Sequence, residues 1–72
     1  IYPNPFNDFL NLKTDNNGQL FIYSPEGQLI YSQNFYSGNN IINTVNWSAG
    51  IYFVIFVNND LVFSKKIIKI YE

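Results

Sequence analysis

The sequence predicts an all-β protein, a small immunoglobulin-like antiparallel β-sandwich of about seven short strands. Short apolar runs follow one another closely and are separated by Gly, Asn and Pro, the residues that favour turns. No segment repeats its hydrophobic residues with the period of a helix. Aromatic residues, which favour strands, make up 19% of the 72 residues. Together these features favour one sandwich over a helical or mixed fold.

The N-terminal elements are an extended segment, a strand and a turn. Tyr2–Phe6 is expected at a sheet edge, because Pro3 and Pro5 stiffen the backbone and remove hydrogen-bond donors. Asp8–Thr14 follows as a strand with alternating leucines on one face. Asp15–Gly18 ends in Asn-Gly, which predicts a hairpin to the next strand.

The middle of the chain is expected to contain three further strands. Leu20–Ser24 and Gln28–Phe35 flank the turn Pro25–Gly27. In this turn the proline presets φ and Gly27 accepts a left-handed conformation. After a polar loop, Ile41–Trp47 is predicted to be a shorter strand, and its alternation does not settle which face is buried.

The C-terminal elements are two strands joined by a turn. Gly50 stands at a break where the backbone needs an unusual φ or a close approach. Ile51–Val57 is apolar on both faces, which predicts a central strand covered on both sides. Tyr52, near its start, is expected to bury its ring and keep its hydroxyl hydrogen-bonded. Asn58–Asp60 then turns the chain into the closing strand Leu61–Tyr71.

Composition narrows the class of protein. Residues 1–72 suffice for one small domain. A net charge of −1 with only 12% charged residues argues against a nucleic-acid partner. The absence of cysteine excludes disulfides and thiolate metal sites. The longest apolar run, Ile51–Val57, is far shorter than the ~20 residues of a membrane-spanning helix. Any export signal is expected upstream of Ile1.

The sequence predicts neither catalysis nor a bound cofactor. Without histidine it lacks the commonest general base and metal ligand, and its carboxylates show no pairing. Asp15–Gly18 is slightly similar to a calcium-binding loop, but the later ligands are missing, so the turn interpretation is favoured. The isolated glycines exclude a phosphate-binding loop. We therefore expect no enzyme, no metal and no cofactor.

The aromatic side chains leave two interpretations open. Tyr and Trp on one face of a β-sandwich stack on sugars in carbohydrate-binding modules, and Trp47, beside a loop, is the first candidate here. In a core this small, however, large rings also bury the most area, so a role in the core is favoured. A third alternative, a structural spacer domain, predicts that the last strand matters for folding alone.

Lys65, Lys66 and Lys69 concentrate the positive charge in the closing strand, because Lys13 is the only other cation. Lysines on an edge strand discourage aggregation between sheets. An exposed basic strand is also a docking element for a partner, and the two interpretations are compatible. The apolar residues of the same strand also predict self-association of the chain through this strand.

Four motifs in one order resemble a known family. They are Tyr2–Pro5, the strand-turn-strand Ile22–Ile30, Trp47–Tyr52 with its Gly-Ile-Tyr, and the lysine-rich Lys65–Lys69. Their order and spacing resemble the C-terminal sorting domain of the type IX secretion system of Bacteroidota, in its type A form, over essentially the whole chain. Two departures from the pattern are Ser24, where many relatives carry Asp, and Trp47, where Leu is usual.

The resemblance implies a role as an address label. The domain would be recognised by the type IX machinery and would direct an N-terminal cargo from the periplasm across the outer membrane. The implied partners are an outer-membrane translocon, a shuttle protein and a surface sortase that commonly removes the domain, and the implied destination is the cell surface or the medium. The residues expected to carry this role are Pro3, Asn4, Pro5, Gly27, Gly50, Tyr52, Lys65, Lys66 and Lys69.

Overall fold

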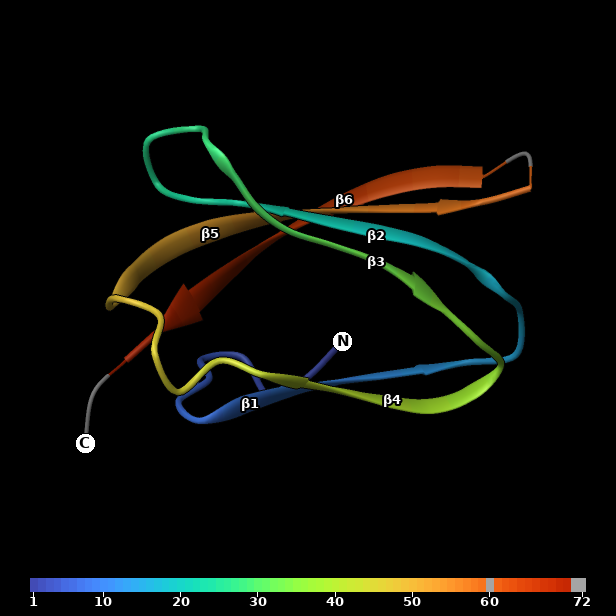
Figure 1. Ribbon diagram of the computed structural model, residues 1–72, viewed down its shortest axis with the longest axis horizontal. Helices are drawn as coiled ribbons and strands as arrows, with labels where there is room; N and C mark the ends of the chain where they lie inside the picture. Colours follow the sequence, from blue (N-terminus) through green and yellow to red (C-terminus); the bar gives the residue numbers. More distant parts are fainter. Residues whose placement is uncertain (60, 71–72) are drawn as a thin grey trace.

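The structure is a computed structural model that describes residues 1–59 and 61–70. These residues form two antiparallel sheets and no helix (Figure 1). One sheet has the order β1-β4 and the other the order β3-β2-β5-β6. The strands are β1 Phe9–Thr14, β2 Gly18–Tyr23, β3 Leu29–Phe35, β4 Gly38–Asn43, β5 Gly50–Asn58 and β6 Leu61–Lys69. The all-β sandwich is therefore confirmed, and the described residues include no helix that could cross a membrane.

The two sheets lie one over the other (Figure 1). The buried side chains, which alternate with exposed ones along the strands, form one core. Leu10 and Leu12 of β1 face Leu20 and Ile22 of β2, as their spacing predicts. Each of these side chains is buried. The buried hydrophobic side chains are Phe6, Leu10, Leu12, Leu20, Ile22, Phe35, Ile42, Tyr52, Val54 and Ile67.

The predicted N-terminal edge segment forms isolated bridges to both sheets rather than a seventh strand. Tyr2 pairs with Asn11 of β1, and Phe6 pairs with Lys69 of β6 in parallel orientation. The segment therefore links an edge of the small sheet to an edge of the large one. The Phe6 ring enters the core at this junction.

The hairpin predicted at Asp15–Gly18 is wrong. β1 pairs with β4 and β2 pairs with β3 and β5, so the turn carries the chain from one sheet to the other. The Oδ1 of Asn17 accepts a 2.8 Å bond from the amide of Ser37, which ties this crossover to the β3–β4 crossover. Gly18 is required for space, because a Cβ there would lie 2.3 Å from the Val57 carbonyl oxygen.

The strand predicted at Ile41–Trp47 begins and ends earlier than expected. It spans Gly38–Asn43, and Trp47 lies in the following turn, where its amide donates to the Thr44 carbonyl at 3.0 Å. The Oδ1 of Asn43 accepts a bond from the amide of Val45 and helps to end the strand.

The expectation that Ile51–Val57 is covered on both sides is also wrong. β5 is a central strand between β2 and β6, but the small sheet covers only one face. Tyr52 and Val54 are buried on that face, whereas Ile51 and Phe53 remain 42% and 44% exposed on the other. Among the described residues, no second layer lies over this outer face.

Candidate recognition surface at the closing strand

β6 lies at the end of the large sheet, with β5 along one side. Its other side is partly occupied by the N-terminal segment. The amide of Phe6 donates to the Ile68 carbonyl at 2.8 Å, and the amide of Ile70 donates to the Phe6 carbonyl at 2.9 Å. The edge is thus closed at its C-terminal half by backbone hydrogen bonds.

Asn4 extends this closure with its side chain. Its Nδ2 donates to the Lys66 carbonyl at 3.3 Å, and its Oδ1 accepts from the Ile68 amide at 3.0 Å. The carboxamide of Asn4 therefore pairs with β6 as a residue of a neighbouring strand would. Pro3 and Pro5 on either side are exposed and lack an amide hydrogen, so both leave this pairing to the asparagine. Sequence patterns assigned Asn4 to a motif but not to this contact.

Lys69 is buried, in contrast to the expected exposed lysine cluster. Its side chain is only 2% exposed, and its Nζ donates to the Thr44 carbonyl at 2.9 Å and to the Asn7 carbonyl. The same ammonium lies 5.7 Å from the centroid of the Phe6 ring. These contacts join β6 to the turns that flank the small sheet. Side chains alternate between the two faces of a strand, so Lys69 shares the inward face with Ile67. This alternation could have indicated the burial of Lys69 from the sequence.

Lys65 and Lys66 are exposed, as expected, and lie on opposite faces of β6. Lys66 is the cross-strand neighbour of Phe53 on the uncovered face, and Lys65 is the neighbour of Val54. The amide and carbonyl of Ile68 bond to Asn4 and Phe6, so they point away from β5. Backbone groups of every second residue in a strand point the same way, so the amide and carbonyl of Ser64 also point away from β5. The described residues place no strand beside this N-terminal half of β6.

The remaining motif residues gather at the corner between the β2–β3 turn and the start of β5. Gly27 has a φ of 87°, as its turn position predicts, and Gly50 has a φ of 152°. A Cβ on Gly50 would lie 3.0 Å from the Cγ of Pro25, so the two segments pack closely. Tyr52 buries its ring, and its hydroxyl donates to the Ser48 carbonyl at 2.5 Å, which confirms the expected arrangement.

Trp47 belongs to an internal aromatic cluster. Its ring meets Phe6 edge-on at 6.1 Å and packs at a tilt against Tyr52 at 5.2 Å and Tyr31 at 6.1 Å. A sugar-stacking surface needs a flat, exposed ring, and Trp47 is half-buried among rings at other angles. The arrangement supports the interpretation of these aromatics as core and gives no support to the carbohydrate-binding alternative.

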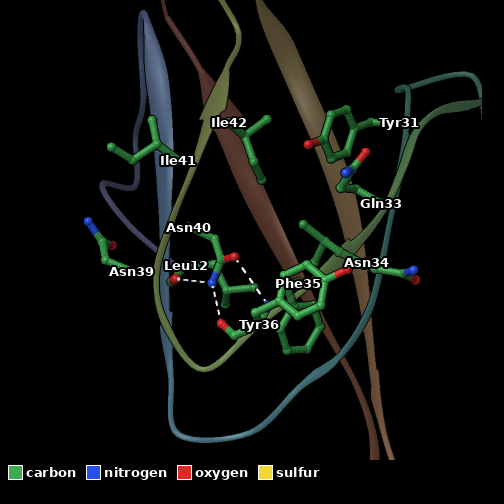
Figure 2. Close-up of a pocket in the computed structure, with 11 residues that line it drawn as sticks. Leu12, Tyr31, Gln33, Asn34, Phe35, Tyr36, Asn39, Asn40, Ile41 and Ile42 are labelled. Carbon is green, nitrogen blue, oxygen red and sulfur yellow. Dashed lines mark hydrogen bonds between the residues drawn. The ribbon is translucent and has the colours of Figure 1, made fainter.

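A groove separates β3 from β4 on the open side of the sandwich (Figure 2). The two strands diverge from the bend at Tyr36, and the space between them measures about 350 Å³. Among residues 1–59 and 61–70, no three His, Cys, Asp or Glu side chains gather at this or any other place to hold a metal ion.

These features define a small β-sandwich whose distinctive surface is a strand edge rather than a catalytic pocket. The comparison with known families agrees: residues 1–70 match the model of the secretion system C-terminal sorting domain. The chain therefore belongs to this family, the sorting signals of type IX secretion, which is not a family of enzymes. Proteins with such a domain are exported through the outer membrane to the cell surface or the medium. Comparisons with curated proteins and with solved structures found no match.

Proposed function

We propose that the sorting machinery recognises residues 1–72 as one unit, and that it does so through the N-terminal half of β6. The observation that carries this proposal is the division of the β6 edge. Asn4 and Phe6 occupy the edge at Lys66–Ile70, while the edge at Ser64 is open. An open strand edge offers main-chain donors and acceptors to an added strand of a partner.

Lys65 and Lys66 supply the specificity in this proposal. Both are exposed and lie on opposite faces of β6. Lys65 follows the open edge at Ser64, and Lys66 stands where the closed part begins, because Asn4 bonds its carbonyl. A partner strand that carries carboxylates at neighbouring positions would gain charge complementarity on both faces. The same lysines protect the free edge from pairing with other copies until the partner binds.

The other motif residues position this edge. Asn4 and Phe6 close the C-terminal half of β6, Pro3 and Pro5 flank Asn4, and Lys69 bonds to the turn that follows β4. Gly27, Gly50 and Tyr52 shape the distant corner and act through the fold. In this view recognition depends directly on Lys65 and Lys66, and indirectly on the rest.

The partners we propose are the outer-membrane translocon, the shuttle protein and the surface sortase of the type IX system. The cargo is the protein attached in front of residue 1. The chain itself contributes binding and no catalysis, which agrees with its lack of histidine and with its family.

A secretion assay in a Bacteroidota host tests the proposal. A periplasm-directed fluorescent reporter carries residues 1–72 at its C-terminus, as wild type, as Lys65→Gln with Lys66→Gln, or as Ser64→Pro. Proline at residue 64 removes an outward amide without touching the β5 pairing. Lys13→Gln, an exposed lysine on β1, is the matched control. Deletion of the strand is unsuitable, because it would remove Ile67 and Lys69 from the core.

We expect wild type and Lys13→Gln to reach the cell surface or the medium, and the two β6 variants to accumulate in the periplasm. Circular dichroism melts of the purified domains must show that all variants remain folded. Normal export of both folded β6 variants would refute recognition through this edge, while failure of the wild-type reporter would count against sorting by residues 1–72 alone.

A further inference from the structure

The two sheets are unequal, and the difference leaves part of the large sheet uncovered. The small sheet has two strands and the large sheet four. β3, one of the two outer strands of the large sheet, directs Tyr31 and Gln33 toward the interior side, opposite the buried Ile22 and Leu20. Tyr31 is nevertheless only half-buried, and Gln33 is exposed. The small sheet therefore lacks a strand opposite β3.

The β3–β4 groove lies at this missing position. Its floor consists of buried core side chains, Leu12, Leu20, Phe35 and Ile42. Tyr31 and Gln33 point into the groove from one side, and Ile42 and Asn40 from the other (Figure 2). Burial in this place also raises the pKa of the Tyr31 phenol.

The free edge of β4 borders the same groove. The amide and carbonyl of Asn11 both bond to Tyr2, so they point away from β4. Backbone groups alternate in direction along a strand, so the amides and carbonyls of Leu10 and Leu12 point toward β4. The β4 partners of those two leucines are Ile42 and Asn40. Ile41 and Asn39 alternate with these two residues along β4, so their amides and carbonyls point to the side of β4 that has no neighbouring strand. Both residues line the groove, although their side chains point away from it (Figure 2).

The closed end of the groove is held in shape by Asn40. Its Nδ2 donates to the Tyr36 carbonyl at 2.7 Å and to the Leu12 carbonyl at 3.3 Å, and its Oδ1 accepts from the Tyr36 amide at 3.2 Å (Figure 2). The bend that joins β3 to β4 is thereby tied to β1. A groove fixed in this way requires little ordering when a ligand binds.

We propose that this groove is a docking site for an extended, uncharged segment of another polypeptide, which adds as a third strand beside β4. The free backbone groups of Asn39 and Ile41 repeat with the spacing of a strand edge, which an extended backbone matches and a helix, whose backbone groups are bonded internally, does not. Alternate side chains of the added strand would cover Leu12, Leu20 and Ile42. No residue that lines the groove is charged, so a segment without Lys, Arg, Asp or Glu at its inward positions is complementary.

This site is distinct from the β6 edge and does not rest on the proposed recognition of Lys65 and Lys66. The two edges belong to different sheets, β4 to the small one and β6 to the large one. They also differ in charge, since the β6 edge is flanked by lysines and the β4 groove is neutral. Binding at each edge is therefore separable by mutation.

The test uses the purified 72-residue chain as bait for displayed random peptides of about eight residues, which is enough for one strand. Ile41→Pro removes one free amide and leaves the β1–β4 pairing intact, and the Ile41 side chain is 68% exposed. Ile41→Val is the matched control, because it keeps the amide. Ser64→Pro is a second control at the β6 edge. Gln33→Glu introduces a charge into the groove without changing any backbone group.

We expect uncharged, β-branched and aromatic peptides to be enriched. They should bind Ile41→Pro about tenfold more weakly than Ile41→Val and wild type, the effect of one lost hydrogen bond. Gln33→Glu should weaken the same peptides, Ser64→Pro should leave them unchanged, and hydrogen exchange should slow at the amides of Asn39 and Ile41.

The proposal is overturned if no peptide is enriched, if the enriched peptides carry charged inward residues, or if neither Ile41→Pro nor Gln33→Glu weakens them. Slowed exchange at Asn39 and Ile41 that depends on the concentration of the chain alone would make a second copy the occupant, which also overturns it. Loss of secretion in Ser64→Pro with normal peptide binding would leave the groove and the sorting proposal independently supported.

Discussion

Both halves of β6 combine apolar residues with lysine, but their environments are opposite. The C-terminal half, around Ile68 and Lys69, is bonded on both sides, by β5 and by Asn4 and Phe6, and its lysine is buried. The N-terminal half, around Ser64 and Lys65, is paired only with β5 within the described residues, and its lysine is exposed. One half of the strand is therefore built for stability, while the other remains available for pairing.

The comparison shows that lysines of one strand can have different structural roles. Lys66 and Lys69 are three residues apart and have the same side chain, but Lys66 points to solvent and Lys69 to the core. An ammonium in the core is tolerated because two carbonyls accept its hydrogens. Substitutions in the two halves should therefore affect different properties.

The largest expected effect is at Lys69. Lys69→Ala removes two charge-assisted hydrogen bonds and the packed stem, and should lower the free energy of unfolding by about 3 kcal/mol. Lys69→Met keeps the stem and removes the desolvation cost of the charge, so its loss should be about half as large. Urea denaturation of the variants measures both. An effect of Lys69→Ala no larger than that of Lys65→Ala would remove the distinction between the two halves.

A smaller effect is expected at Asn4. Asn4→Ala removes the two side-chain bonds to β6 in an exposed place and should cost about 1 kcal/mol. Hydrogen exchange at the Ile68 amide should accelerate, whereas exchange at Ser64 should already be fast and stay so. Asn4→Asp is the matched control, because it keeps the acceptor for Ile68 and loses the donor to Lys66. Unchanged exchange at Ile68 in Asn4→Ala would contradict the proposed closure of the edge.

The smallest effect on stability is expected at the exposed lysines. Lys65→Gln combined with Lys66→Gln should change the free energy of unfolding by less than about 0.5 kcal/mol, because exposed side chains contribute little. A melt of this double variant, compared with Lys69→Met, checks the assignment. A large loss of stability in the double variant would mean that these lysines, too, are structural, and its export defect could then not be attributed to recognition.

Sequence patterns predicted some parts of the fold well. The leucines of β1, the turn at Gly27 and the burial of Tyr52 follow from local alternation and turn chemistry, and all three are confirmed. The Asn-Gly at residues 17 and 18 was misleading, because a tight turn can join two sheets as well as two paired strands. Gly18 is needed there to avoid Val57, a residue distant in sequence.

The candidate surface was predicted in composition but not in arrangement. The motif around Asn4 and the lysines of the closing strand were identified from sequence, and their contact with each other was not. Asparagine explains part of this gap. Asn4, Asn17 and Asn40 each bond backbone groups of separate segments, and nothing in the local sequence specifies which.

The sequence by itself determined the β class, most of the strand positions and the family, because these depend on alternation, turn residues and motif order along the chain. Only the tertiary structure decided that β1 pairs with β4, that Lys69 is buried, and that the free edges lie at Ser64 and at Ile41. The physical reason is that a strand's periodicity sets which side chains share a face. Which strand pairs with its edge depends on packing between residues far apart in the sequence.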